Sequence, residues 1–218
     1  MPPPPLPTDA NRAQLTRWIT EWSLNYNFGH DDQLKNVVRK RSFEINDAIT
    51  ILRWKLQEDQ VPDAKRALEG FDARYPGRIA AATQAAIAAP DDTTALGQLA
   101  GIPWLQGPSV GTVVLMVGDP DRWTVSDVNA NRTLVELREH LAHQAGQPNL
   151  ELHEIAKTLA NYLPTDASEG APGTKPRYEA SWKDWPNYMA AIREIQHATW
   201  LSLRTIDRAF YQCRGAVA

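Results

Sequence analysis

The sequence contains a single cysteine, Cys213, and only five histidines among its 218 residues. One thiol cannot form an internal disulfide, and by itself it cannot hold an iron–sulfur cluster or a cysteine-rich zinc site. Two of the histidines, His140 and His143, lie close together on one expected helix, with His153 and Glu154 further along, but no third ligand follows at a fixed spacing. We therefore predict no metal site and no cofactor.

The chain also lacks a long hydrophobic run, because no apolar stretch approaches the roughly 18 residues that a membrane span needs. Its first residues, MPPPPLPTD, show no cationic region followed by an apolar one, so we expect no secretory signal and treat residues 1–8 as an extended, proline-rich leader. These absences predict a cytoplasmic protein without a membrane partner, and we expect a monomer.

An excess of positive charge is missing as well. The net charge is -3 and the isoelectric point is near 6.0, whereas nucleic-acid-binding proteins usually carry a basic footprint. Positive charge is densest in the stretch KNVVRKRS, which holds Lys35, Arg39, Lys40 and Arg41. This stretch is either a solvated helix end or a local contact with DNA.

What the sequence does contain is helical periodicity. Apolar residues recur at helical spacing in most segments, and strand-like alternation is confined to TVVLMV, whose β-branched residues suit a strand as well as a buried helix. We predict an all-α fold of about nine or ten helices in one domain over residues 9–218, with a flexible loop at 164–186. Expected helix ends include Thr8 or Asp9, then Ser42, Asn46 or Asp47, then Asp91 or Asp92 as caps, and Gly101 as a stop.

The segment from 103 to 130 combines a Gly-Pro turn, an apolar run and an isolated acid. Pro108 suits the first position of a helix that would run to about Val117, and the amides beside Gly107 would then be free to bind a phosphate. Asp127 follows an apolar stretch and precedes the next helix. Taken locally, this carboxylate is either a helix cap or a catalytic group.

Residues 99–131 resemble the helix-hairpin-helix and aspartate signature of the HhH-GPD superfamily of DNA glycosylases. The hairpin corresponds to PWLQGPSVG, and Asp127 lies eighteen residues after Ser109, which stands where bifunctional members carry a lysine and adenine glycosylases a serine. Asn129 matches the asparagine that follows the aspartate in adenine glycosylases. One departure is Leu105, which replaces the first hairpin glycine.

The resemblance implies a multi-helix fold with a central cleft and a monofunctional glycosylase that acts on double-stranded DNA. Asp127 would be the catalytic carboxylate, and Asn129 would position a water or a phosphate. The stretch AITILRWKLQEDQ would form the helix that leads to a side chain wedged into the DNA stack, which would place Lys55 or Gln57 near the damaged base. The expected DNA-binding residues are Arg53, Lys55, Gln57, Gly107, Ser109 and Gly111. Two alternatives stay open: a non-catalytic DNA-binding module that keeps this fold, and a helical interaction protein.

Overall fold

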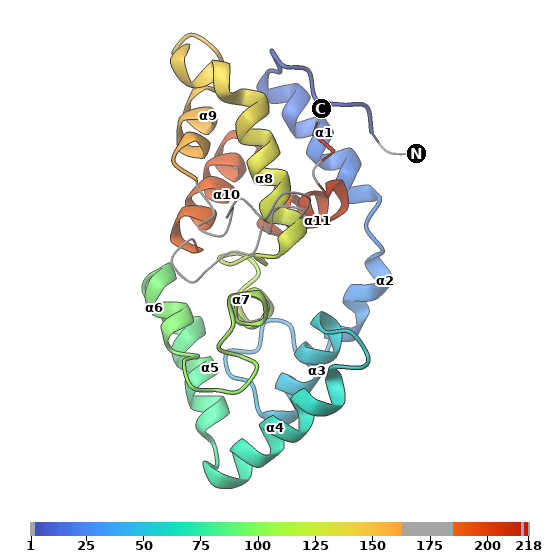
Figure 1. Cartoon of the computed structure of the whole chain (residues 1–218), viewed down its shortest axis with the longest axis vertical. Coiled ribbons are helices and arrows are strands. Elements are labelled where there is room, and N and C mark those ends of the chain that lie inside the picture. Colours follow the sequence, from blue (N-terminus) through green and yellow to red (C-terminus); the bar gives the residue numbers. More distant parts are fainter. Residues whose placement is uncertain (1–2, 163–184, 215, 218) are drawn as a thin grey trace, which may run out of the picture. The chain divides into compact units, whose positions relative to one another are not determined.

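The computed structural model describes residues 3–162, 185–214, 216 and 217. Within these ranges the regular structure is entirely helical, with eleven α-helices and two short 3-10 helices (Figure 1). The predicted all-α class is confirmed, although the number of helices slightly exceeds the prediction. The TVVLMV stretch forms part of a helix rather than a strand.

The chain divides into two compact units. Unit 1 comprises Met1–Tyr26 and Ser126–Ala218, and unit 2 comprises Asn27–Val125. The chain therefore leaves unit 1 after its first helix and returns to it just before Asp127. The single domain expected over residues 9–218 and the central cleft stay predictions.

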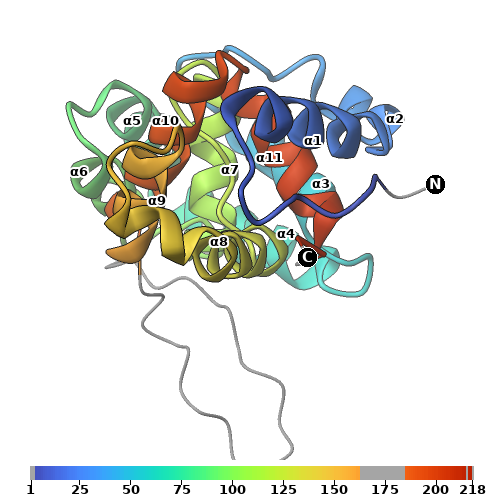
Figure 2. The same ribbon diagram turned by 90° about the horizontal axis from the view of Figure 1, so that it is seen from above.

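The described residues of unit 1 form five α-helices and one 3-10 helix. Helix α11 packs along α1 and also against α8, as both views show (Figure 2). Thr133 ties α8 to α11, because its hydroxyl donates to the Phe210 carbonyl over 2.9 Å. The elements are α1 (Arg12–Leu24), α8 (Val128–Leu141), η2 (Ala142–Gly146), α9 (His153–Ala160), α10 (Trp185–Thr199) and α11 (Leu203–Cys213).

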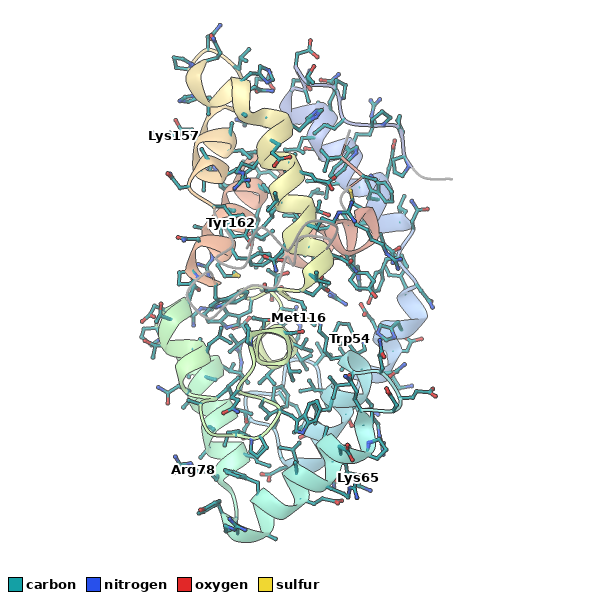
Figure 3. The ribbon with its side chains drawn as sticks, viewed as in Figure 1. Trp54, Lys65, Arg78, Met116, Lys157 and Tyr162 are labelled. Atoms are coloured by element: carbon teal, nitrogen blue, oxygen red, sulfur yellow. The ribbon has the colours of Figure 1, made fainter. Side chains whose placement is uncertain are left out.

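Unit 2 is built around one buried helix, α7. Every residue of α7 from Val110 to Gly118 is buried, and α3, α5 and α6 all pack against this helix. Figure 3 shows α7 along its axis, with Met116 labelled on it and Trp54 on α3. The elements are α2 (Phe28–Asp31), η1 (Asp32–Leu34), α3 (Ile45–Lys55), α4 (Val61–Arg74), α5 (Arg78–Ala88), α6 (Asp92–Gly97) and α7 (Pro108–Gly118).

Several helix ends differ from the sequence prediction. Helix α1 is capped by Asn11, which forms a capping box with Gln14, and not by Thr8 or Asp9. Gly101 does not end α6, which stops at Gly97. In both places a residue nearer the helix supplies the cap geometry, and the residue predicted from composition lies in the flanking turn.

Two other ends follow the sequence more closely. Helix α3 begins after Glu44, whose N–H donates to the Asp47 carboxylate over 3.3 Å. Asp91 caps α6 through the N–H of Thr94 over 2.8 Å. Asp91 is therefore the cap that the sequence predicts, whereas the N-cap of α3 is Glu44 and not Ser42, Asn46 or Asp47, although Asp47 completes its capping box.

The proline-rich leader is extended but packs onto unit 1. Leu6 is buried, and its N–H donates to the Val217 carbonyl over 3.0 Å. The side-chain amide of Gln144 also donates to the carbonyls of Thr8 and Ala10. These contacts join the described part of the leader to the residues after α11 and to η2.

The flexible loop predicted at 164–186 lies outside the described residues as far as residue 184. Its last two residues differ from the prediction, since Trp185 and Pro186 begin α10. None of the described helices has the length and apolar character that spanning a membrane requires.

Gly118 allows α7 and α5 to approach closely. A Cβ atom at residue 118 would lie 2.4 Å from Cδ1 and 2.5 Å from Cγ1 of Ile87, which is itself buried. We predict that Gly118→Ala lowers the free energy of unfolding by about 1–3 kcal/mol, because the Ile87 side chain must shift in a close-packed core. Urea unfolding followed by circular dichroism measures the change.

Gly70→Ala is the matched control, because a Cβ at residue 70 of α4 meets nothing within 4 Å. This variant should gain about 0.5–1 kcal/mol through helix propensity. Equal effects of the two substitutions would contradict the packing role of Gly118.

Candidate active site

Asp127 is the N-cap of α8. Its backbone is extended, and one carboxylate oxygen, Oδ1, accepts the N–H groups of Asn129 and Ala130, each over 2.9 Å. The side chain is half-buried. The structure thus confirms the helix-cap interpretation and fixes the carboxylate in one orientation.

A buried polar network lies directly behind Asp127. The side-chain amide of Asn131 donates to the Asp127 carbonyl over 2.8 Å and to the Ser126 hydroxyl over 3.1 Å. The Tyr162 hydroxyl in turn donates to Asn131 Oδ1. Asn131, Ser126 and Tyr162 are all buried, so the first turn of α8 is held from inside the unit as well as by its cap.

The sequence does not predict this network. Its only signal was a polar residue, Asn131, on the apolar face of an amphipathic helix. Buried polar side chains need hydrogen-bond partners. The side-chain partners of Asn131 are Ser126, which precedes the cap, and Tyr162, which follows α9. No local pattern links Asn131 to Tyr162.

Aromatic side chains form the next layer around the network. Tyr188 stacks on Trp185, with ring centroids 5.6 Å apart, and lies 6.3 Å from the Tyr162 ring. Figure 3 shows Tyr162 beside α10, which carries the other two rings. Trp185 falls within the predicted loop at 164–186, so the sequence does not place it in this aromatic group.

The pKa of Tyr188 is shifted by burial and by the charges around it. Burial raises the pKa of its hydroxyl well above 10.0, and the negative charges of Asp207 and Asp127 raise this pKa further. Asp207 forms an ion pair with Arg204, and their side chains are only 4% and 15% exposed. The interior next to Asp127 therefore holds charge that is screened little by water.

Asn129 occupies the first turn of α8 and is half-buried. Its backbone N–H donates to the Asp127 carboxylate, and its carbonyl accepts a hydrogen bond of 3.0 Å from the Thr133 hydroxyl. Within the described residues its side-chain amide makes no hydrogen bond. Its proposed contact with a water or a phosphate stays a prediction.

The hairpin residues belong to unit 2. Leu105, which replaces the first hairpin glycine, is fully buried together with its backbone, so this residue cannot approach a phosphate. The positive φ in the turn is taken by Trp104, at 65°, and by Gly101, at 81°. The exposed residues of the hairpin are Gln106 and Ser109, whereas Pro103, Trp104, Gly107 and Pro108 are half-buried.

No side chain caps the N-terminus of α7 among the described residues. Gly107 is the N-cap without any side-chain hydrogen bond, and Pro108 at the first helical position has no N–H. Within the described residues the N–H groups of Ser109 and Val110 have no acceptor. Unpaired amides at a helix N-terminus favour an anion.

Ser109 and Gly111 differ in their surroundings. Ser109 is exposed, and its side chain does not cap α7. Gly111 is buried, and a Cβ there would lie 2.9 Å from the Leu96 side chain and 3.0 Å from the Leu105 carbonyl oxygen. We therefore leave Gly111 out of the proposed DNA contacts and assign it a packing role.

The residues predicted near the lesion lie at the end of α3. Arg53 and Lys55 are in its last turn, where positive charge also suits the helix dipole. Gln57 follows the helix and is exposed, as is Arg53, whereas Lys55 is half-buried. Their insertion into a DNA stack stays a prediction.

The basic stretch at 35–41 is largely neutralised. Arg39 forms two hydrogen bonds to Asp121, of 2.6 and 3.2 Å, and Arg41 pairs with Asp119 over 2.6 Å. Lys40 pairs with Asp47 over 2.7 Å. The structure thus ties this stretch to acidic residues of its own unit.

The histidines do not assemble a metal site in the part of the chain that the structure describes, where no group of three potential ligands lies together. The ring nitrogen Nδ1 of His153 lies 3.0 Å from the Gln144 carbonyl. This contact gives the residue a structural partner.

Comparisons with protein-family models, with curated proteins and with solved structures find no match to this chain.

The buried tyrosine yields a pH prediction. Because the pKa of Tyr188 is higher in the folded chain than in the unfolded one, the neutral hydroxyl contributes stability that is complete below about pH 10 and is lost as the pH rises through the folded pKa. Tyr188→Phe should therefore lose less stability than the parent protein between pH 9 and about pH 11. Urea unfolding across this range measures the difference, and Tyr75→Phe, at an exposed tyrosine, should follow the parent curve.

Proposed function

We propose that the protein is a monofunctional DNA glycosylase, which hydrolyses the N-glycosidic bond of a damaged or modified base flipped out of double-stranded DNA. The observation that carries this proposal is the carboxylate of Asp127. It is fixed by two backbone amides and backed by a buried network, at the sequence position where the resemblance expects a catalytic aspartate.

Breaking an N-glycosidic bond develops positive charge on the sugar ring. A carboxylate held in a fixed place can stabilise that charge and orient a water for attack. Because Oδ1 of Asp127 already accepts two N–H groups, the direction of the carboxylate does not depend on the substrate. Preorganisation of this kind is what lowers a barrier.

Two further features support the proposal. The side-chain amide of Asn129 makes no hydrogen bond in the described chain, so it can bind the water or a phosphate. The amides of Ser109 and Val110 at the start of α7 suit a backbone phosphate.

The central test is base release by Asp127→Asn. Asparagine caps helices about as well as aspartate, so the variant should fold normally but lose the charge that opposes the sugar cation. Under single-turnover conditions, we expect base release from duplexes carrying a panel of modified bases to fall at least about 100-fold, as is usual for loss of one electrostatic group.

Asp91→Asn is the matched control, because Asp91 is also a helix N-cap and accepts one backbone N–H. It should leave the rate unchanged. Undiminished base release by Asp127→Asn, with both variants folded, would overturn the catalytic role of Asp127.

The monofunctional assignment has its own test. Ser109 has no amine, so no Schiff base can form with the abasic product at this position. Borohydride added during turnover should trap no covalent protein–DNA complex. A trapped complex would point to an amine elsewhere in the chain and contradict this part of the proposal.

A second candidate function is a helical interaction protein without a DNA partner. The pairing of Arg39, Lys40 and Arg41 with acidic residues favours it, because these cations are partly neutralised already. Electrophoretic binding to duplex DNA at two salt concentrations separates the candidates. A glycosylase should bind more tightly at low salt, and absence of binding at both concentrations would favour the interaction protein.

A further inference from the structure

Trp200 is the most exposed large hydrophobic side chain among the described residues, at 86% exposure. It follows α10 directly, with φ of 60°, and its N–H donates to the Gln196 carbonyl over 2.8 Å. This is the helix-terminating position that glycine usually occupies, and a bulky residue with positive φ is rare there. Neither packing nor backbone geometry therefore calls for tryptophan.

An open pocket of about 550 Å³ lies beside Trp200 in unit 1. Ala13 of α1 and Ala198 and Thr199 of α10 contribute apolar surface to its wall. The Thr199 hydroxyl already donates to the Ile195 carbonyl over 2.7 Å. This volume is in the range of about 300–1,000 Å³ that small-molecule sites span.

Charge is unevenly placed around this pocket. Arg12 and Arg17 of α1 both line it and are exposed. Their guanidinium groups make no ion pair or hydrogen bond with any described residue. The Glu151 carboxylate also lines the pocket, and its Oε2 accepts the Arg12 N–H over 2.9 Å. The site thus carries two cationic groups and one anchored carboxylate.

We propose that this pocket binds a nucleotide. An exposed indole offers a face on which a base can stack, and two free arginines match a phosphate group. The Glu151 carboxylate would accept a hydrogen bond from the exocyclic amino group of a base such as adenine. The apolar wall between these groups suits the ring itself.

The proposal does not depend on the glycosylase activity, because none of these residues belongs to the network around Asp127. The ligand can come from two sources: a free nucleotide, or a single-stranded segment of nucleic acid. Both present the same base and phosphate.

The experiment uses the full chain and two probes, adenosine monophosphate and a fluorescently labelled, 5′-phosphorylated oligodeoxyadenylate. Calorimetry measures binding of the first and fluorescence anisotropy binding of the second. Trp200→Gly should weaken binding at least about 10-fold, since stacking on an aromatic side chain contributes about 1–3 kcal/mol per base. The same variant should keep or raise the midpoint of thermal unfolding, because glycine suits the positive φ.

Arg17→Ala should also weaken binding and reduce its dependence on salt. Tyr75→Ala and Arg74→Ala are matched controls in unit 2, since Tyr75 is an exposed aromatic residue and Arg74 an exposed cation. They should leave the affinity unchanged, as should Asp127→Asn. Retained binding in this last variant separates the pocket from the glycosylase site.

If both probes bind and both lose affinity in Trp200→Gly, the proposal is supported and a free nucleotide suffices as the ligand. Binding of the oligonucleotide alone, again dependent on Trp200, supports it with a single strand as the source. The proposal is overturned if neither probe binds, or if Trp200→Gly binds both with unchanged affinity. If the affinity of Trp200→Gly is unchanged, contact of Trp200 with a protein partner becomes the better interpretation.

Discussion

The burial of α7 on every side is the constraint on which unit 2 depends. A helix without a polar face must be surrounded at close range, and here glycine provides the space: Gly111 beneath the Leu105 carbonyl and Gly118 beneath Ile87. The Arg39 N–H donates to the Val117 carbonyl over 2.7 Å near the end of the helix. The hairpin before α7 and the turn after it are therefore positioned by packing, whatever the function of their exposed atoms.

A structural role and a chemical role for Asp127 do not compete. The cap uses Oδ1, and the two amides that bind it are fixed by the first turn of α8. Asn131 ties the Asp127 backbone to Ser126 and, through Tyr162, to the segment after α9. A flexible carboxylate would have to be ordered by the substrate at a cost in free energy, whereas a capped one is ordered already.

The sequence was informative wherever a feature is local. Helical periodicity and the Pro108 start predicted α7 to within a residue, and Asp91 was correctly predicted as a cap. It was uninformative where partners lie far apart along the chain. Neither the Asn131–Tyr162 hydrogen bond nor the Arg39–Asp121 pair follows from any spacing, because tertiary packing alone brings such side chains together.

Residues with positive φ separate two kinds of backbone strain in this protein. Arg39 gains a hydrogen bond to α7 and an ion pair with Asp121, and Trp104 is half-buried within the hairpin, so local contacts compensate for both. Trp200 has no comparable burial. The Trp200 N–H donates to the Gln196 carbonyl, but no packing holds its side chain, which is 86% exposed. Because backbone strain tends to cluster at functional positions, the turn after α10 differs from the hairpin, although both place a tryptophan in the same left-handed conformation.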